Sequence, residues 1–225
     1  GSIPADIESN AVAKVVVDRT NDKRLLIDFA NRTWRKKHTG TAVWGPGPNY
    51  FSKKQVKVDR DGRLRLRIAK RGGLWRCAEA ILTQSLGYGT YRFRVDSDTS
   101  GFPNPVVLGL FTYSDNAEMA HREIDVEFSN GAVVGWPDNW QYAIQPYYEQ
   151  GHRYRFPLPA GTQKSVHEFT WSPGKVDFRS FDAFGQPIMS QTMTNGVPLP
   201  GDEVIHINLW LLDGTPPVQE TDPSR

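Results

Sequence analysis

The chain has 225 residues, of which 38% are hydrophobic and 12% aromatic, and its formal net charge at pH 7 is +2. A chain of this length fits one large domain or two small ones, and all-β sandwiches of this size are commonly single domains. The near-neutral charge provides no strong field for nucleic acid or an anionic membrane. No apolar run approaches the length of a membrane span, and a single cysteine excludes an intramolecular disulfide.

Apolar and polar residues alternate with a period of two along nearly the whole chain, which predicts β-strands. The stretch 55–68 alternates on both sides of Asp61-Gly62 and predicts a β-hairpin. The strands expected after it lie at 89–95, 105–113, 121–128, 166–172, 176–181 and 204–212. Of these, 105–113 and 204–212 are more continuously apolar, as is typical of inner strands covered on both faces.

Turn-forming residues recur between these strands, and no stretch predicts a helix of three turns. The pattern therefore indicates an all-β sandwich of antiparallel strands. No repeat or linker divides the chain, so we expect one domain over 1–225 with loose termini at 1–10 and 215–225. Gly1-Ser2 resembles a cloning remnant, and the absence of a signal pattern leaves room for a targeting peptide removed from the natural protein.

The segment HREIDVEF (121–128) carries the strongest functional signal. Residues two apart on a strand share a face, so Glu123, Asp125 and Glu127 lie together opposite three apolar residues. Adjacent like charges repel and do not stabilise a sheet. Such an inconsistency with stable design is expected at functional sites.

Glycoside hydrolysis is the chemistry that fits, because it needs two carboxylates in different protonation states. The Cα atoms of Glu123 and Glu127 would be roughly 13 Å apart on a strand. A retaining reaction places its carboxyl groups about 5–5.5 Å apart, so both side chains must lean together. Asp125 can share a proton with one of them. The alternatives from the pattern alone are an exposed acidic strand or a calcium site.

Over Trp44 to Trp210 the chain resembles glycoside hydrolase family 16, and within it the lichenases (endo-β-1,3-1,4-glucanases). The motifs that carry the resemblance are CAE (77–79), YGTY (88–91), LFTY (110–113), EIDVEF (123–128), FTWSPGKVDF (169–178) and INLW (207–210). The resemblance implies a β-jelly-roll sandwich of two curved antiparallel sheets (concanavalin A-like), with a sugar-binding cleft across the concave face.

By this resemblance Glu123 matches the nucleophile, Asp125 the assisting acid and Glu127 the general acid/base. The compact E-x-D-x-E spacing is that of lichenases and xyloglucan transglycosylases, whereas laminarinases, agarases and carrageenases typically carry one more residue. The transglycosylases also have a cysteine-bridged extension, which a chain with Cys77 as its one cysteine lacks.

The same resemblance implies a set of substrate-binding residues. From the strand motifs these are Glu79, Tyr113, Asn208 and Trp210, and from the loops Asn49, Gln145 and Tyr147. His121 is a further predicted substrate-binding residue, although it and Ile81 depart from the lichenase pattern, which has Trp and Arg at these positions. Trp136 and Trp140, in the inserted stretch 129–140, are candidate replacement rings. The basic runs 35–37 and 53–54 are interpreted as solvated surface.

The sequence thus predicts a secreted or periplasmic, monomeric, retaining endo-β-glucanase acting on β-1,3-1,4- or β-1,3-glucan, with no nucleic-acid or membrane partner. The alternatives are a transglycosylase, a galactan-active relative and a non-catalytic carbohydrate-binding module. No cofactor is required. A structural calcium is common in the family, but no motif in this chain specifies it.

Overall fold

The computed structural model describes residues 23–130, 138–159 and 162–217, together with the backbone of Ser2–Ile3, Ala5–Ser9 and Lys14–Val15. Nearly all of the regular structure is antiparallel strand, arranged in two large sheets with two small ones beside them. The helical segments of the described residues are single 3-10 turns. They are η1 (Lys23–Leu25), η2 (Lys53–Gln55), η3 (Thr99–Gly101), η4 (Ala120–Arg122) and η5 (Leu212–Gly214).

The larger sheet forms the layer that matters for the site. In spatial order it contains β16 (Arg153–Phe156), β15 (Trp140–Ile144), β14 (Ile124–Ser129), β13 (Val106–Tyr113), β20 (Val204–Leu211), β10 (Leu74–Leu82), β5 (Arg32–Lys36) and β4 (Leu26–Phe29), with β6 (Tyr50–Phe51) and β9 (Ala69–Arg71) also paired to β10. Only the β6–β10 pairing is parallel among these pairs of described strands. The centre of this sheet therefore joins segments far apart in the chain.

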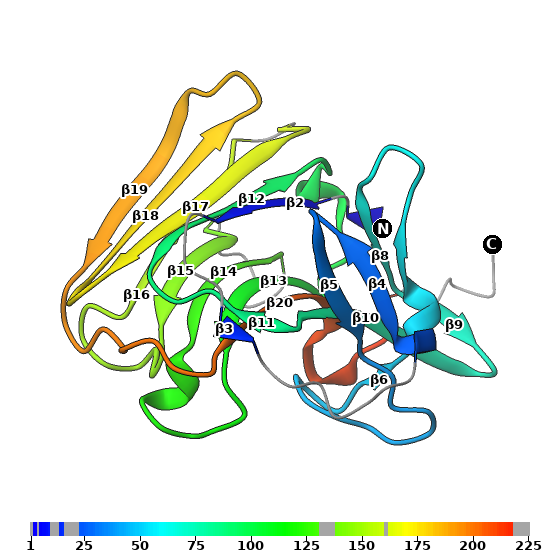
Figure 1. The fold of residues 1–225 in the computed structure, drawn as a ribbon. Coiled ribbons are helices and arrows are strands. Elements are labelled where there is room, and N and C mark those ends of the chain that lie inside the picture. The colour runs from blue at the N-terminus through cyan, green and yellow to red at the C-terminus, as the bar shows by residue number, and fades with distance from the viewer. Residues whose placement is uncertain are drawn as a thin grey trace.

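The second large sheet has the order β19 (Pro187–Met193), β18 (Lys175–Asp182), β17 (Ser165–Ser172), β12 (Gly89–Val95) and β2 (Ala5–Ser9). Smaller sheets join β1 (Ser2–Ile3), β8 (Leu64–Arg67) and β7 (Val56–Val58), and β11 (Gln84–Ser85) with β3 (Lys14–Val15). In Figure 1 strands β12, β17, β18 and β19 form one layer above β13 to β16. The fold is thus the predicted all-β jelly-roll sandwich.

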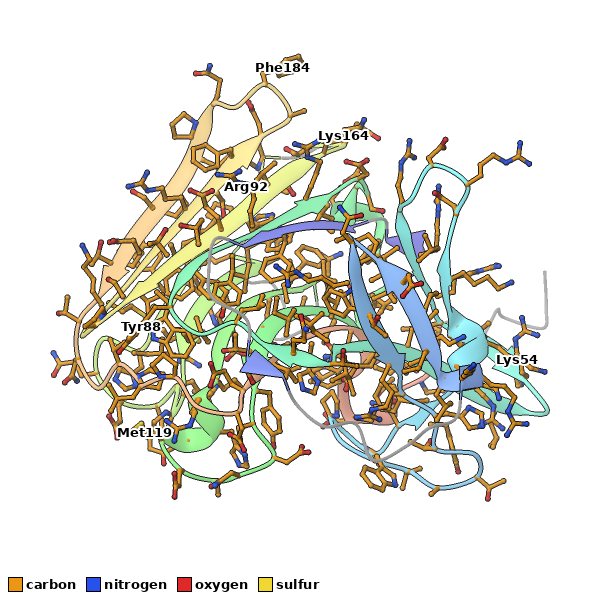
Figure 2. All side chains as sticks on the ribbon, viewed as in Figure 1. Lys54, Tyr88, Arg92, Met119, Lys164 and Phe184 are labelled. Atoms are coloured by element: carbon orange, nitrogen blue, oxygen red, sulfur yellow. The ribbon has the colours of Figure 1, made fainter. Side chains whose placement is uncertain are left out.

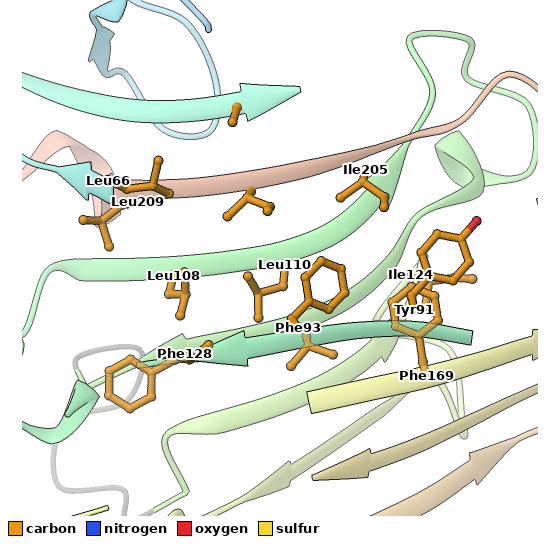
Figure 3. Packing of buried hydrophobic residues seen from close by; sticks show 14 of the residues in the cluster. Leu66, Tyr91, Phe93, Leu108, Leu110, Ile124, Phe128, Phe169, Ile205 and Leu209 are labelled. Carbon is orange, nitrogen blue, oxygen red and sulfur yellow. The ribbon is translucent and has the colours of Figure 1, made fainter. Parts of the chain in front are cut away.

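The core lies between the two large sheets and is built from the apolar face of each strand. The three apolar residues of β14 alternate with the acids and are completely buried. Figure 3 shows Leu108 and Leu110 of β13 facing the same interior as Phe93 and Phe169 of the second sheet. The rings of Tyr91 and Phe169 stack with their centroids 4.8 Å apart. Burying such side chains contributes about 1.5–3 kcal/mol each.

Every range predicted as a strand contains one, but one of them starts later than predicted, and β4, β5, β10, β15, β16 and β19 were not predicted. The hairpin 55–68 is present as β7 and β8, with Asp59 Oδ1 accepting bonds from the amides of Asp61 and Arg63. The inner strands 105–113 and 204–212 correspond to β13 and β20, although one face of each forms the floor of a cleft rather than a second core. The predicted strand 121–128 begins only at Ile124, because residues 119–122 form a left-handed turn.

No helix of the described residues is long and apolar enough to cross a membrane.

Candidate active site

A cleft of about 880 Å³ lies on the face of the larger sheet that points away from the core. Its floor is built from β14, β13, β20, β10 and β5, and its rim includes residues 38, 39 and 44–46. The strand register aligns the floor residues in two rows that cross the strands. One row is Asp125, Phe111, His206, Ile81 and Arg35, and the other is Glu127, Gly109, Asn208 and Glu79. A linear ligand lying across the strands would contact these residues in turn.

The three predicted carboxylates lie together at one end of these rows. Asp125 and Glu127 belong to β14, and Glu123 immediately precedes it in an extended conformation. All three line the cleft. Asp125 is only 1% exposed, and its Oδ2 accepts a hydrogen bond from Gln145 Nε2 at 2.9 Å. Its Oδ1 has no hydrogen-bond partner among the described residues. The pKa shifts of the pair correspond to a hydrogen bond from protonated Asp125 to the Glu123 carboxylate.

Burial raises the pKa of all three groups, because the low-dielectric site disfavours the charged form. The pKa of Glu123 rises to about 7, with the Asp125 hydrogen bond opposing the rise and the Glu127 charge adding to it. The pKa of Asp125 lies well above its usual value because of burial and the Glu123 charge. The pKa of Glu127 rises to about 8 through burial and the Asp125 charge, against the attraction of Arg155. Near neutral pH one carboxylate and one carboxylic acid can therefore face the same ligand.

The turn before β14 fixes the position of Glu123. Met119, Ala120, His121 and Arg122 all have φ between 51° and 63°, which is a left-handed turn of non-glycine residues. Thr112 holds its end, since its Oγ1 donates to the Arg122 carbonyl at 2.9 Å and accepts from the Ile124 amide at 3.1 Å. Glu123 lies between these two bonded residues, so the turn sets where its side chain enters the cleft.

Arg122 ties this turn to the segment before β20. Its guanidinium donates to the Leu199 carbonyl at 2.6 Å and pairs with Glu118 at 3.1 Å. Met119, labelled in Figure 2, lies at the outer edge of the turn, and its sulfur accepts from Arg122. The strained turn is therefore braced from two sides.

A second polar cluster occupies the middle of the cleft floor. Asn208 Nδ2 donates to Glu79 Oε1 at 2.8 Å, and His206 Nδ1 lies 3.2 Å from Glu79 Oε2. Burial alone would raise the pKa of Glu79, but the hydrogen bond and charge of His206, with the Lys37 charge 3.5 Å away, hold it below its usual value. Asn208 Oδ1 is buried without a hydrogen-bond partner among the described residues.

The remaining predicted residues divide between the cleft and its surroundings. Tyr113 and Trp210 line the cleft. His121 does not line it and is not in a strand; its ring stacks on Tyr113 with centroids 4.6 Å apart. Gln145 also does not line it, but it contacts Asp125. The left-handed turn thus places His121 outside the strand in which the sequence located it.

Two loop residues lie elsewhere. Asn49 is buried, and its amide donates to the carbonyls of Pro46 and Leu211 at 2.7 and 2.8 Å, so it braces the 45–49 loop and does not line the cleft. Tyr147 is 50% exposed beside Tyr148 and does not line the cleft, although its amide donates to Gln145 Oε1 at 2.9 Å. Trp136 lies outside the described residues, and Trp140 is a core residue with no exposed surface.

The structure also brings together cleft residues that the sequence did not single out. Trp44, 61% exposed, stands at the rim, and Phe111 lies on the floor. Arg35 and Lys37, interpreted from sequence as solvated surface, line the cleft instead. The available signal was alternation, because Trp34 is buried and its neighbour Arg35 must then face the opposite side.

No group of three or more His, Cys, Asp or Glu side chains in the described part of the chain could hold a metal ion. The carboxylates of the cleft do not fit a calcium site, since protonation of the buried pair competes with cation binding.

Comparison with known proteins gives fold matches alone: neither a protein-family model nor a curated protein matches the chain. Among solved structures, a Bacillus licheniformis β-glucanase has a TM-score of 0.61 at 19% identity, covering 89% of this chain and 85% of its own. A β-1,3-1,4-glucanase (lichenase) from a mouse hindgut metagenome has a TM-score of 0.55 at 18% identity, covering 92% and 86%. An immunostimulatory antigen and pseudo β-1,3-glucanase of Mycobacterium tuberculosis has a TM-score of 0.52 at 19% identity, covering 78% and 79%. The chain therefore has the jelly-roll fold found in the β-glucanases of glycoside hydrolase family 16.

Proposed function

We propose that the protein is a glycoside hydrolase that cuts a β-linked glucan internally and with retention of configuration. The observation that carries the proposal is the placement of Glu123, Asp125 and Glu127 on one wall of an open cleft, with raised pKa values. An open cleft across several strands accommodates a polysaccharide chain. The printed activities of the β-glucanase and the lichenase that share the fold favour a β-glucan as substrate.

In the first step Glu123, ionised, attacks the anomeric carbon while Glu127, protonated, donates its proton to the leaving oxygen. Formation of the glycosyl–Glu123 ester removes the negative charge of that carboxylate. The pKa of Glu127 then falls because one repelling anion is gone, so it can act as the base that activates water. Hydrolysis of the ester restores Glu123 and releases a sugar with the original configuration.

The role proposed for Asp125 is to influence the protonation of Glu123, and not to attack the anomeric carbon itself. Its hydrogen bond favours the ionised form of Glu123, and Gln145 fixes the opposite oxygen of Asp125. Tyr113 and Trp210 offer faces for stacking on sugar rings. Asn208 Oδ1 and the ionised Glu79 beside it accept hydrogen bonds from sugar hydroxyls in the middle of the cleft.

The test is hydrolysis of mixed-linkage glucan and laminarin by the parent and by Glu123→Ala, followed as reducing-sugar release. We expect the variant to lose activity by a factor of at least about 10³, because no other group can form the ester. Azide should rescue the variant with an inverted glycosyl azide product, and Asp61→Asn, on the distant hairpin, is the matched control. Parent-like hydrolysis by Glu123→Ala would exclude the assigned nucleophile.

The pseudo β-1,3-glucanase among the fold matches favours one alternative, a protein that binds glucan without cutting it. Binding to glucan with no reducing-sugar release by the parent would establish that alternative. Transglycosylation is distinguished by adding labelled oligosaccharide acceptors and following whether the label enters longer products.

A further inference from the structure

The cleft has unequal charge along its length. Its carboxylates lie on or beside β14, β13 and the start of β20, apart from Glu79 on β10. At the β5 end the lining instead includes Arg35, Lys37 and His38. Arg35 pairs in register with Ile81 and ends the row that begins at Asp125. A ligand that crosses the strands would thus leave the acidic wall and reach a basic one.

Arg35 differs from Lys37 in having no charge partner among the residues that the structure describes. Lys37 Nζ lies 3.5 Å from Glu79 Oε2 and donates to the Gly45 carbonyl, so its charge is satisfied within the fold. Arg35 is half-buried, and within residues 23–130, 138–159 and 162–217 its guanidinium makes no hydrogen bond or ion pair. A guanidinium offers five donors in a planar fork, and leaving them unpaired in a partly desolvated cleft stabilises nothing in the free protein.

The surroundings of Arg35 reinforce the positive field. Burial and then the charges of Lys53, Arg76 and Lys54 lower the pKa of His38 at the same end of the cleft. Lys54, on η2, is labelled in Figure 2. Nδ1 of His38 accepts from the Lys53 amide at 3.2 Å, so the neutral ring carries its proton on Nε2 and is a donor there. The end of the cleft is thus set up to donate hydrogen bonds.

Trp44 gives this end a surface for a sugar ring. It is 61% exposed and lines the cleft, and it does not belong to the core cluster of the described residues or to the side chains packed against that cluster. Its backbone is fixed, because its amide and carbonyl both pair with Asn49 at 2.9 and 3.2 Å. Asn49 is anchored in turn to the Leu211 carbonyl at 2.8 Å. An exposed indole on a braced turn is suited to stacking against the apolar face of a sugar.

We propose that the β5 end of the cleft is a subsite for a sugar unit bearing an anionic substituent, with Arg35 binding the anion and Trp44 the ring. The substituent is a sulfate ester or a carboxylate, both of which match the guanidinium fork. The proposal rests on the proposed function and narrows its substrate to an anionic β-linked polysaccharide. Arg35 is four strands from Asp125, or about 19 Å at a spacing of about 4.8 Å, so the anion is kept away from the acidic wall.

The experiment compares binding and hydrolysis of a neutral β-glucan, its sulfated form and its carboxymethylated form by the parent, Arg35→Gln, Arg35→Lys and Arg60→Gln. Dissociation constants are measured by calorimetry and kcat/KM by reducing-sugar release. We expect the parent to bind at least one anionic form about tenfold or more tightly than the neutral one. The preference should vanish in Arg35→Gln, partly persist in Arg35→Lys and persist in Arg60→Gln, whose side chain is on a distant hairpin.

Equal affinity of the parent for neutral and anionic forms, or a preference that survives Arg35→Gln, overturns the proposal while leaving the proposed function intact. Binding of anionic glucan with this Arg35 dependence but without hydrolysis supports the subsite and overturns the hydrolase. Failure to bind any form overturns both. Thermal unfolding of each variant identifies loss of binding that results from misfolding.

Discussion

Opposing influences act on the pKa of the Glu127 carboxyl. Burial and Asp125 raise its pKa to about 8, and Arg155 on β16 pulls it down. Arg155 is oriented by its Nε bond to Gln141 Oε1 at 3.0 Å, and Gln141 is directly across from Glu127 in the sheet register. The arginine therefore sets the upper end of the pH range in which Glu127 can donate a proton.

We predict that Arg155→Gln moves the alkaline limb of kcat/KM to higher pH. Removing a cation disfavours the ionised carboxylate, so the pKa of Glu127 rises and the protonated acid persists further into the alkaline range. In the parent, the acidic limb should lie near pH 7 from ionisation of Glu123, and the alkaline limb near pH 8 from ionisation of Glu127. Full pH profiles of kcat/KM measure both limbs.

Arg153→Gln is the matched control, because this arginine lies over the Tyr147 ring and is no cause of the Glu127 shift. Its profile should match that of the parent. A downward shift of the alkaline limb in Arg155→Gln would contradict the assignment of Glu127 as the acid.

Gly109 lies between Asn208 and Glu127 in the cleft floor, where there is no room for a side chain. A Cβ at this position would overlap Asn208 Oδ1 and come within 3.1 Å of the Phe111 ring. We predict that Gly109→Ala displaces the Asn208 side chain and lowers kcat/KM by about tenfold or more, through loss of a hydrogen bond to the sugar. Gly101→Ala, which meets nothing within 4 Å, is the control for kcat/KM and for thermal unfolding. An unchanged kcat/KM in Gly109→Ala would remove Asn208 from sugar binding.

The left-handed turn at 119–122 destabilises the backbone locally, but it positions Glu123. Left-handed backbone costs non-glycine residues roughly 1–2 kcal/mol each, so the turn persists only because its surroundings hold it. The Ser114 amide bonds to the His121 carbonyl at 2.8 Å, and the His121 ring bonds back to the Ser114 carbonyl at 2.7 Å. Thr112 fixes the far end next to Glu123.

We predict that Thr112→Val lowers both stability and kcat. The two hydrogen bonds made by its hydroxyl are lost, and a carbonyl and an amide are left unpaired, which costs about 1–3 kcal/mol in free energy of unfolding. Glu123 should also lose its fixed position, so kcat should fall more than KM changes. Urea unfolding and steady-state kinetics measure the two effects.

Thr90→Val is the control for this change, because Thr90 bonds to Thr170 within the second sheet at 2.9 Å. It should lose a similar type of contact without affecting kcat. Equal loss of kcat in both variants would show that the effect on catalysis is a general consequence of instability.

At the scale of the whole molecule, the alternation of apolar and polar residues predicted which face of a strand each side chain occupies. It did not predict which strands lie next to one another in a sheet. It correctly placed the apolar residues of β14 in the core and the acids together, because both facts follow from the period of a single strand. The cleft rows depend on register between β10 and β20, which are far apart in the chain. No pattern within a single strand specifies that Glu79 lies opposite Asn208, or that the strand of Arg35 pairs with β10.

For a related reason, two loop residues predicted to bind substrate do not line the cleft. Asn49 and Tyr147 were aligned to a family pattern in segments whose shape depends on contacts outside the segment. The Asn49 amide is used by the Leu211 carbonyl, so a side chain with the polarity of a ligand-binding group instead braces a turn. Strand motifs transferred better, as the cleft positions of Tyr113, Asn208 and Trp210 show, because the sheet itself fixes which way they face.

Joining the two large sheets, a buried polar network gives the sandwich a pH-dependent stability. His167 is completely buried, with Nδ1 2.6 Å from Ser180 Oγ and Nε2 2.9 Å from Ser165 Oγ. Its ring stacks on Trp140 of the opposite sheet, with centroids 4.0 Å apart. Burial lowers the pKa of His167 to about 3, so the folded protein holds it neutral.

We predict that acid weakens the fold through this histidine. The unfolded pKa of about 6.5 lies above the folded value, so the unfolded chain takes up the proton first and stability is lost as pH falls from about 6.5 toward 3. At pH 5 the His167 contribution amounts to a loss of about 2 kcal/mol relative to pH 7.5. The buried acids of the cleft act in the opposite direction, since their raised pKa values favour the folded state at lower pH.

The measurement therefore compares the change in free energy of unfolding between the two pH values in the parent and in His167→Gln, each obtained by urea unfolding. The variant has no group to protonate at this site, so its stability should change less between them. An identical pH dependence in both proteins would mean that the protonated imidazole is accommodated in the fold, contrary to the closed network around it.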